Sequence, residues 1–221
     1  MPRLRRSALA GYCYHVVCRA NRRETIFHGR ADYRDALTLM ARAQERRHLR
    51  LLGFCLMPNH MHLVVWPENT NDMSRWMQWF LAVQTQRHNL RHGTVGHLWQ
   101  GRFKSFPIQQ DGHLLTVLRY VERNALRADL VGRAEDWPWS SLASRHSGHA
   151  SDLLTEPPVP LSADWTAWVN APQTPAELEA IRSSVARGSP FGRANWVART
   201  ARDLSLEQTL RPRGRPPKEE G

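Results

Sequence analysis

The distribution of hydrophobic side chains predicts several short strands in the first half of the chain. Residues 12–18 are β-branched and aromatic, a composition typical of a strand. Residues 49–57 and 61–66 form two further apolar runs, and the Pro58-Asn59 pair between them predicts a hairpin turn. Residues 96–109 mix aromatic and basic side chains in a pattern that predicts a broken strand.

Three other segments place their apolar residues three or four positions apart, as an amphipathic helix does. They are residues 32–47, 73–90 and 114–131. Together with the strands they give the order strand, helix, strand, strand, helix, strand, helix. Hairpins mixed with helices favour an antiparallel sheet with helices packed on it, so we expect an α+β fold rather than a doubly wound parallel sheet.

Charge divides the 221 residues into three parts. Residues 1–145 carry 22 basic and 11 acidic side chains and should form the main domain. Residues 146–181 carry five acidic side chains, five prolines and no lysine or arginine, which indicates a linker or a wrapped extension. Residues 182–221 form a basic C-terminal extension, and its last eleven residues lack large apolar side chains and should be disordered.

The net charge of +11 favours a polyanionic partner. Of the 31 basic residues, 29 are arginine, whose planar guanidinium group binds phosphate through two hydrogen bonds where lysine makes a single point contact. Nucleic acid fits better than a membrane surface because no basic amphipathic segment stands out. The apolar runs are too short to cross a bilayer. Three cysteines cannot all pair, so we expect no disulfide framework and a location in the reducing cytoplasm. A nucleic-acid partner would make the protein nucleoid-associated.

Two histidines carry the first candidate chemistry. His60 and His62 flank one apolar residue, Met61, and on a strand positions i and i+2 project from the same face. Two adjacent imidazoles are half of a metal site, although such a triplet can also be incidental. Tyr120 and Asn124 lie one helical turn apart and would emerge together, unless Tyr120 is a core aromatic and Asn124 a helix-end residue.

Several sequence blocks in a fixed order resemble the single-tyrosine HUH transposases. They are residues 56–65 (LMPNHMHLVV), 97–105 (HLWQGRFKS), 119–124 (RYVERN) followed by 127–131 (RADLV), and 137–141 (WPWSS). The tail, with residues 190–192 (PFG), Trp196 and 211–216 (RPRGRP), resembles the extension of the REP-associated tyrosine transposase branch. One position departs from that branch: Ala125 stands where it usually has proline, so we expect a helix without a proline kink.

The resemblance implies a ferredoxin-like or RRM-like HUH fold and a role for each candidate residue. His60, His62 and Asn124 would be ligands of Mg²⁺ or Mn²⁺, and Tyr120 would be the nucleophile. The implied activity is cleavage and transfer of single-stranded DNA through a 5′-phosphotyrosine link. The implied substrates are REP-like palindromes, folded as hairpins with a short single-stranded foot. We expect a monomer, as in this branch, although related insertion-sequence transposases act as dimers.

Basic and aromatic residues are the candidates for holding DNA. Arg102 and Lys104 should share one face of a strand, with Trp99 close by as a stacking surface, unless the two cations line a solvated strand edge and Trp99 is a core residue. An N-terminal basic arm and an AT-hook-like core in the tail could contact duplex grooves. The arginines of these two segments are Arg3, Arg5, Arg6, Arg213 and Arg215.

Two charged features remain open to more than one interpretation. Arg119 and Arg123 flank Tyr120 and could lower its pKa, but solvated helix charges or phosphate contacts are the alternative. The acidic segment 146–181 could fold back over the DNA groove and compete with DNA, using Trp165 and Trp168 as anchors. In the alternative, both tryptophans pack structurally.

Two other functions compete with the transposase. A domesticated relative could bind repeats without catalysis, but the presence of all four candidate site residues favours an active enzyme. A plasmid-type replication nickase is disfavoured by the small size of the chain and the missing helicase-like region. A covalent adduct on a labelled hairpin would separate an active enzyme from an idle DNA-binding protein.

Overall fold

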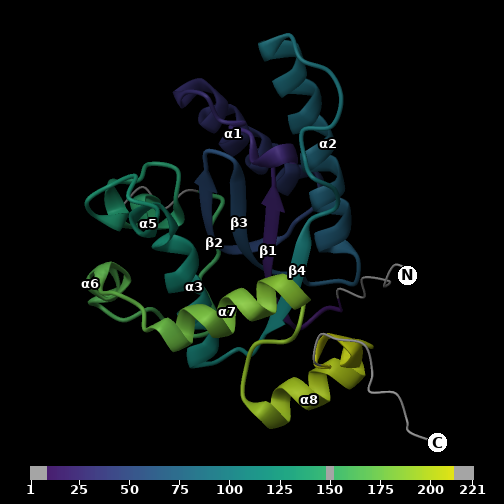
Figure 1. The fold of residues 1–221 in the computed structure, drawn as a ribbon, viewed down its shortest axis with the longest axis vertical. Coiled ribbons are helices and arrows are strands. Elements are labelled where there is room, and N and C mark those ends of the chain that lie inside the picture. Colours follow the sequence, from purple (N-terminus) through teal and green to yellow (C-terminus); the bar gives the residue numbers. More distant parts are fainter. Residues whose placement is uncertain (1–8, 148–151, 212–221) are drawn as a thin grey trace, which may run out of the picture.

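The computed structural model of the chain describes residues 9–147 and 152–211 (Figure 1). Within them, four strands form one antiparallel sheet in the order β2-β3-β1-β4. Their bounds are β1 (Cys13–Arg19), β2 (Arg50–Met57), β3 (His60–Trp66) and β4 (Lys104–Ile108). The N-terminal arginines Arg3, Arg5 and Arg6 and the tail arginines Arg213 and Arg215 lie outside the described residues.

Helices cover both faces of this sheet (Figure 1). They are α1 (Arg30–Arg46), α2 (Asp72–His92), α3 (Gly112–Glu122), α4 (Asn124–Arg127), α5 (Ser141–His146), α6 (Trp165–Asn170), α7 (Pro175–Arg187) and α8 (Ala194–Asp203). Helices α1 and α2 pack on one face, and α3 packs on the other with α6 and α7 against it. The order β1-α1-β2-β3-α2-β4-α3 and the sheet order confirm the expected α+β, ferredoxin-like arrangement.

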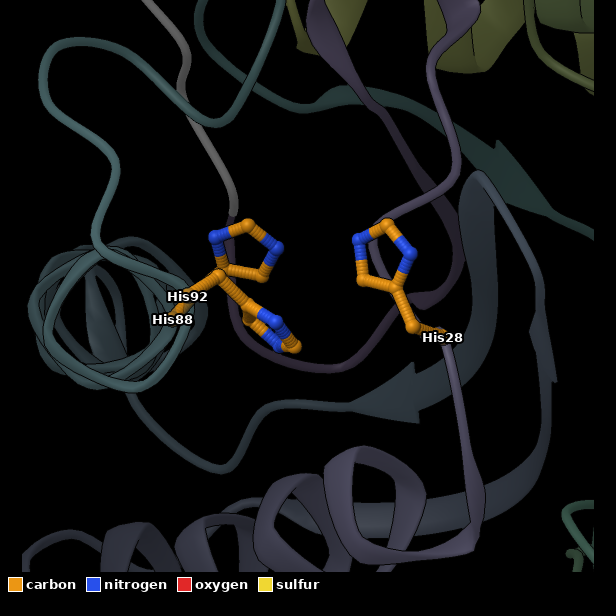
Figure 2. Close-up of side chains that lie close together, drawn as sticks. All are labelled: His28, His88 and His92. Atoms are coloured by element: carbon orange, nitrogen blue, oxygen red, sulfur yellow. The ribbon is translucent and has the colours of Figure 1, made fainter.

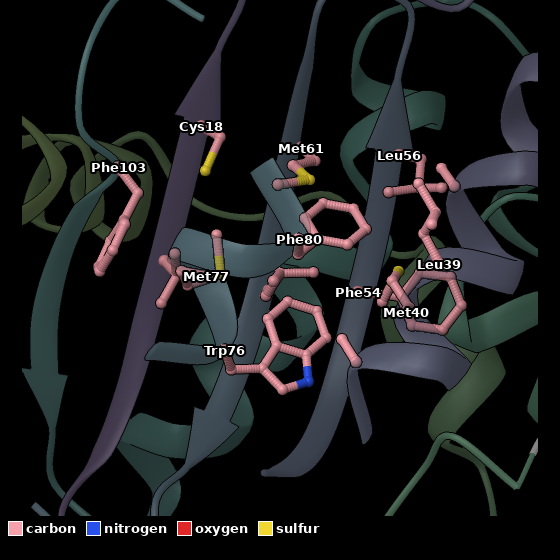
Figure 3. Close-up of a cluster of buried hydrophobic side chains, with 14 of the residues drawn as sticks. Cys18, Leu39, Met40, Phe54, Leu56, Met61, Trp76, Met77, Phe80 and Phe103 are labelled. Atoms are coloured by element: carbon pink, nitrogen blue, oxygen red, sulfur yellow. The ribbon is translucent and has the colours of Figure 1, made fainter. Parts of the chain in front are cut away.

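Alternation along the strands sorts side chains between two cores. Met61 of β3 and Cys18 of β1 face the α1–α2 side, where they meet Trp76 and Phe80 of α2 and Phe54 of β2 (Figure 3). The residues on either side of Met61 must then point to the α3 side. The hydrophobic middle residue of the histidine triplet is therefore a core residue, as the alternation predicts.

Helix α3 lies unusually close to β2 at Gly53. The pairing of β2 with β3 shifts register between Leu51 and Gly53, as in a β-bulge. A Cβ atom at position 53 would lie 2.8 Å from Leu118 Cδ2 of α3 and 3.2 Å from Ser141 Oγ. A larger residue here would force the Leu118 side chain to shift, so Gly53 helps α3, the helix that carries Tyr120, to pack closely on β2.

One expectation about local structure is confirmed and one was wrong. The segment 96–109 is a broken strand, as expected: it is regular only at Lys104–Ile108, because the chain is irregular around Gly96 and Gly101, which both have positive φ. The predicted helix over residues 114–131 is interrupted even without a proline. It ends at Glu122, and a separate turn of helix, α4, begins at Asn124.

Later parts of the chain cover both outer strands of the sheet. The Thr155 amide donates a hydrogen bond to the Leu51 carbonyl of β2 at 2.8 Å. On the opposite edge, the Phe191 amide donates to the Pro107 carbonyl of β4 at 2.9 Å. Each contact continues the sheet by one parallel bridge.

None of the helices in residues 9–147 and 152–211 combines the length and the hydropathy that crossing a bilayer requires.

Candidate active site

The two predicted imidazoles lie side by side on β3, on the face that α3 covers. The ring centroids of His60 and His62 are 5.0 Å apart, and His62 is buried whereas His60 is half-buried. Burial lowers the pKa of His60 to about 4, with smaller contributions from Arg19 and Arg127. Burial also holds the pKa of His62 well below its ordinary value. Both rings are therefore neutral near pH 7, which is the form that binds a metal ion.

A third histidine, His15 of β1, orients His62. His15 Nε2 lies 2.9 Å from His62 Nδ1, and the two rings stack with centroids 5.0 Å apart. This hydrogen bond occupies Nδ1 of His62 and leaves its Nε2 free as a ligand atom, the usual arrangement behind a metal-binding histidine. On the neighbouring ring, His60 Nδ1 lies 2.7 Å from Asn59 Oδ1, which likewise leaves Nε2 free.

Sequence reasoning missed His15 and the role of Asn59. The strand alternation of residues 12–18 places His15 on one face, but only the pairing of β1 with β3 brings it beside His62. The sequence pattern around Asn59 indicates a turn and nothing more. Its side chain also donates to the Arg23 carbonyl at 3.0 Å, so it braces the turn as well as His60.

Tyr120 of α3 lies against the histidines. Its ring is edge-on to His62 at 5.9 Å and to His15 at 6.1 Å between centroids, and 7% of the residue is exposed. The structure thus brings three of the four predicted site residues together from β3 and α3. Asn124 lies just after the helix break, is buried, and its Nδ2 atom has no hydrogen-bond partner among the described residues.

Arg127 is a further residue to which sequence reasoning gave no role. Its guanidinium carbon lies 4.0 Å from the centroid of the Tyr120 ring, and its Nη1 donates to the Tyr120 carbonyl at 3.3 Å. Desolvation lowers the pKa of Arg127 from its ordinary value, but arginine keeps its charge in proteins. A fixed positive charge therefore faces the tyrosine ring.

Arg119 and Arg123 contact the backbone at the end of another helix, a role that the sequence analysis did not consider. Arg119 Nη2 donates to the carbonyls of Ala171 and Pro172 at 2.7 and 3.0 Å. Arg123 Nη1 donates to the carbonyl of Val169 at 3.0 Å and also to that of Asn170. These arginines bind the carbonyl end of α6 and hold it on α3: Arg119 is buried and Arg123 half-buried, and both guanidinium groups donate to these carbonyls.

Glu122, the last residue of α3, is fully buried and joins three helices. It accepts hydrogen bonds from Ser141 Oγ at 2.6 Å, Arg145 Nε at 3.3 Å and Trp165 Nε1 at 2.7 Å. Trp165 and Trp168 also pack against each other, and the Arg119 guanidinium lies over the Trp168 ring at 4.6 Å. These contacts support the alternative in which the tryptophans of the acidic segment pack structurally.

Replacing Trp165 with phenylalanine should lower the free energy of unfolding by about 1.5–3 kcal/mol, because it removes a hydrogen bond to a buried carboxylate. Urea denaturation followed by circular dichroism measures this loss. Trp168→Phe is the matched control and should cost less, since Trp168 is half-buried and its ring contact with Arg119 can persist. Equal losses in the two variants would contradict the role given to the indole N–H.

A basic cavity of about 330 Å³ opens beside the histidines. Its charged lining comes from Arg19, Arg102 and Lys104. Across the sheet, Val17 of the lining pairs with both His62 and Lys104, so the cavity lies one strand away from the imidazoles on the same face. Arg19 joins the predicted pair of cations, and it was not singled out from the sequence.

Trp99 differs from the two predicted cations near it. It is 7% exposed and packs in the core on the α1–α2 side of the sheet. Because the ring is buried, it offers little surface on which a base could stack. The alternation of basic and aromatic residues in the sequence does not show which of these side chains points into the core.

Comparison with known proteins agrees with this arrangement. The family described as "Transposase IS200 like" matches residues 8–124. A Haemophilus influenzae protein assigned as a REP-associated tyrosine transposase is 28% identical over 101 residues, which are 41% of this chain and 57% of that relative. The chain therefore spans little more than half the length of that relative.

A solved structure of a REP-associated tyrosine transposase bound to a REP hairpin has the same fold. The TM-score is 0.56 at 19% identity, and the match covers 79% of this chain and 99% of the other. At this identity the likeness concerns the fold alone. The family match, in contrast, extends over more than half of the sequence and includes the histidine pair, Tyr120 and Asn124. The chain therefore belongs to the family of IS200-like transposases.

Proposed function

We propose that the protein cleaves single-stranded DNA and transfers the strand through a covalent link to Tyr120. The observation that carries this proposal is the position of the Tyr120 ring, 5.9 Å from that of His62, with the Arg127 charge 4.0 Å from its centre. A phenol has a pKa of about 10 and is a poor nucleophile near neutral pH unless its anion is stabilised. The Arg127 guanidinium lies where it could stabilise negative charge that develops on Tyr120 during the reaction.

A divalent ion fits the residues beside Tyr120. His60 and His62 are neutral and each has one nitrogen free of the hydrogen bonds described above, and the buried Asn124 offers a neutral amide oxygen. These three residues would hold Mg²⁺ or Mn²⁺, and imidazole ligands favour Mn²⁺ as the tighter binder. When bound, the ion would neutralise charge on the phosphate and stabilise the departing oxygen.

The proposed reaction exchanges one phosphate ester for another. The Tyr120 oxygen forms a bond to phosphorus, and the bond from phosphorus to the 3′ oxygen breaks. One DNA end remains as a 5′-phosphotyrosine ester, and the other leaves as a 3′-hydroxyl that has gained a proton. Because the ester bond is conserved, another 3′-hydroxyl can attack it and rejoin DNA without ATP.

The basic cavity is the proposed site for the unpaired strand. Arg19, Arg102 and Lys104 place three cations one strand away from the histidines, so a DNA backbone lying along them would pass the reacting groups. The relative of known structure is bound to a REP hairpin, which supports a hairpin with a single-stranded foot as the substrate. We propose that the protein acts as a monomer at the nucleoid.

The double variant Arg102→Gln/Lys104→Gln should bind the hairpin foot more weakly. The slope of log affinity against log salt should also become shallower by about 0.7 for each phosphate that the variant no longer neutralises. Fluorescence anisotropy at several salt concentrations measures both effects. Arg34→Gln/Arg75→Gln removes two exposed charges from α1 and α2 and serves as the control. If the control changes the slope as much, the effect is one of overall charge and the cavity has no special role.

Asn124→Ala should impair cleavage less drastically than loss of a histidine. Water can replace one neutral oxygen ligand, so cleavage should fall but recover partly in excess Mn²⁺. Cleavage rates over a Mn²⁺ titration measure the recovery. Failure of rescue, with the fold intact by circular dichroism, would mean that Asn124 is not a ligand.

The central experiment incubates the full-length protein with a hairpin labelled at its 5′ or 3′ end and Mn²⁺, followed by a denaturing gel. The proposal expects a slowly migrating protein–DNA species that carries the 3′ label only, since the 5′ end of the downstream strand joins Tyr120. A nick without that species indicates a hydrolytic nuclease. Binding without either product indicates an idle DNA-binding protein.

A further inference from the structure

A second group of histidines lies away from the Tyr120 site. His28, in the loop before α1, faces His88 and His92 of α2 across a small space (Figure 2). One ring nitrogen from each residue lies within 4.8 Å of the others. The ring centroids are 4.6 Å apart for His88–His92, 4.7 Å for His28–His92 and 5.8 Å for His28–His88.

Helix geometry preorganises two of these rings. His88 and His92 are four residues apart on α2, so they lie on one face of a rigid helix. A tetrahedral zinc ion with Zn–N distances of about 2.0–2.1 Å requires ligand nitrogens about 3.3 Å apart. The present separations, all within 4.8 Å, are not far above that value, so a bound ion would have to draw the three rings only slightly closer together.

Asp32 supplies the carboxylate that usually stands behind a metal-binding histidine. Its Oδ1 lies 3.0 Å from His92 Nε2, and its Oδ2 accepts the His28 backbone amide at 2.8 Å. This contact occupies Nε2 of His92 and leaves Nδ1 of that ring free for a ligand bond.

The ring nitrogens of His88 are poorly satisfied. Both are buried, and within residues 9–147 and 152–211 neither makes a hydrogen bond of good geometry, although the Asn89 side chain lies close enough to interact. A buried polar atom normally has a well-placed partner, so these nitrogens need an explanation. A cation at the centre of the three rings supplies one.

We propose that His28, His88 and His92 form a second metal site, for Zn²⁺ or a similar transition-metal ion, with water as the fourth ligand. Three imidazoles select such ions over Mg²⁺, which prefers oxygen. The site is distinct from the one beside Tyr120, because α2 packs on the opposite face of the sheet from α3.

The proposed ion would join the loop before α1 to α2. The same loop touches the turn that precedes His60: the amides of Ile26 and Phe27 both donate to the Pro58 carbonyl, at 2.8 and 3.1 Å. Metal binding at His28 would thus stabilise this loop and, through its hydrogen bonds to Pro58, the turn that leads into His60. Its role is structural, as a clamp, and is independent of the proposed cleavage chemistry.

The test uses the full chain carrying His60→Ala, which disrupts the imidazole pair near Tyr120 at a half-buried position. After chelation and desalting, Zn²⁺ is titrated in a calorimeter, and Co²⁺ is titrated with visible absorption as a report of tetrahedral geometry. We expect one Zn²⁺ per chain. Adding His28→Ala or His88→Ala should lower the affinity by about 100-fold, because one of three protein ligands is lost.

Two further variants sharpen the test. Asp32→Asn keeps an oxygen for the amides at the start of α1 but removes the charge behind His92, so affinity should fall by about 10-fold. His48→Ala, at an exposed histidine outside both clusters, is the matched control and should bind as the parent does. His28 is exposed, so its variant should fold even if the His88 variant does not.

Absence of stoichiometric Zn²⁺ binding in the His60→Ala chain would overturn the proposal. So would binding that survives both His28→Ala and His88→Ala unchanged. Neither result bears on the covalent adduct with DNA, so failure of this site and failure of the proposed function are separate outcomes.

Discussion

Tyr120→Phe should eliminate both the covalent protein–DNA species and strand joining while leaving hairpin binding near that of the wild type. The substitution removes one oxygen and keeps the ring that packs on His62, His15 and Arg127. Rates should fall by roughly 10⁴-fold or more, the order of effect expected when a nucleophile is deleted.

The assay is the labelled hairpin with Mn²⁺ on a denaturing gel, together with anisotropy for binding. Tyr33→Phe is the matched control, because Tyr33 is also a buried tyrosine but stacks on Phe27 and Trp139 in the opposite core. It should form the adduct normally. Nicking by the Tyr120 variant at the wild-type rate would show that water is the nucleophile and that the proposed mechanism is wrong.

Loss of either paired imidazole should abolish cleavage and spare most DNA binding. Binding depends on many phosphate contacts, whereas cleavage depends on the ion that His60 and His62 would hold. His62→Ala should also lower the free energy of unfolding by about 1–3 kcal/mol, since it leaves His15 Nε2 buried without its hydrogen bond. His60→Ala should have a smaller effect on stability because His60 is half-buried.

Three measurements on the same proteins check this prediction: cleavage on the gel, affinity by anisotropy, and unfolding in urea. His48→Ala again provides a histidine variant outside the site. An equal loss of binding and cleavage in folded His60→Ala protein would count against a metal role and would suggest that the imidazole contacts DNA instead.

The spacing of apolar residues along the sequence was sufficient to predict those parts of the fold that depend on residues close together in the chain. Alternation placed His60 and His62 on one face with Met61 in the core, and the Pro58-Asn59 pair marked the hairpin between β2 and β3. The approximate extents of α1 and α2 also follow from the spacing of apolar residues.

Contacts between distant segments could not be predicted in the same way. His15 reaches His62 only through strand pairing across 47 positions, and Arg119 finds its carbonyl partners 52 and 53 positions away. The proximity of Tyr120 to the histidines came from a family resemblance and not from periodicity. The inward turn of Trp99 shows the same limit, because burial is decided by what packs on a strand.

The coverage of both sheet edges has a practical consequence for shortened forms of the protein. Leu154 bridges β2 and Phe191 bridges β4, so a fragment ending at residue 145 would lack both bridges. Strand β4 would then lose its bridge, and β2 would keep the bridge between Cys55 and Ser140 but lose the one at Leu51, so the exposed edges could act as templates for cross-β association between copies. A fragment trimmed to the main domain should therefore precipitate during expression, and preparations for crystallography or for screening should retain the chain through Phe191.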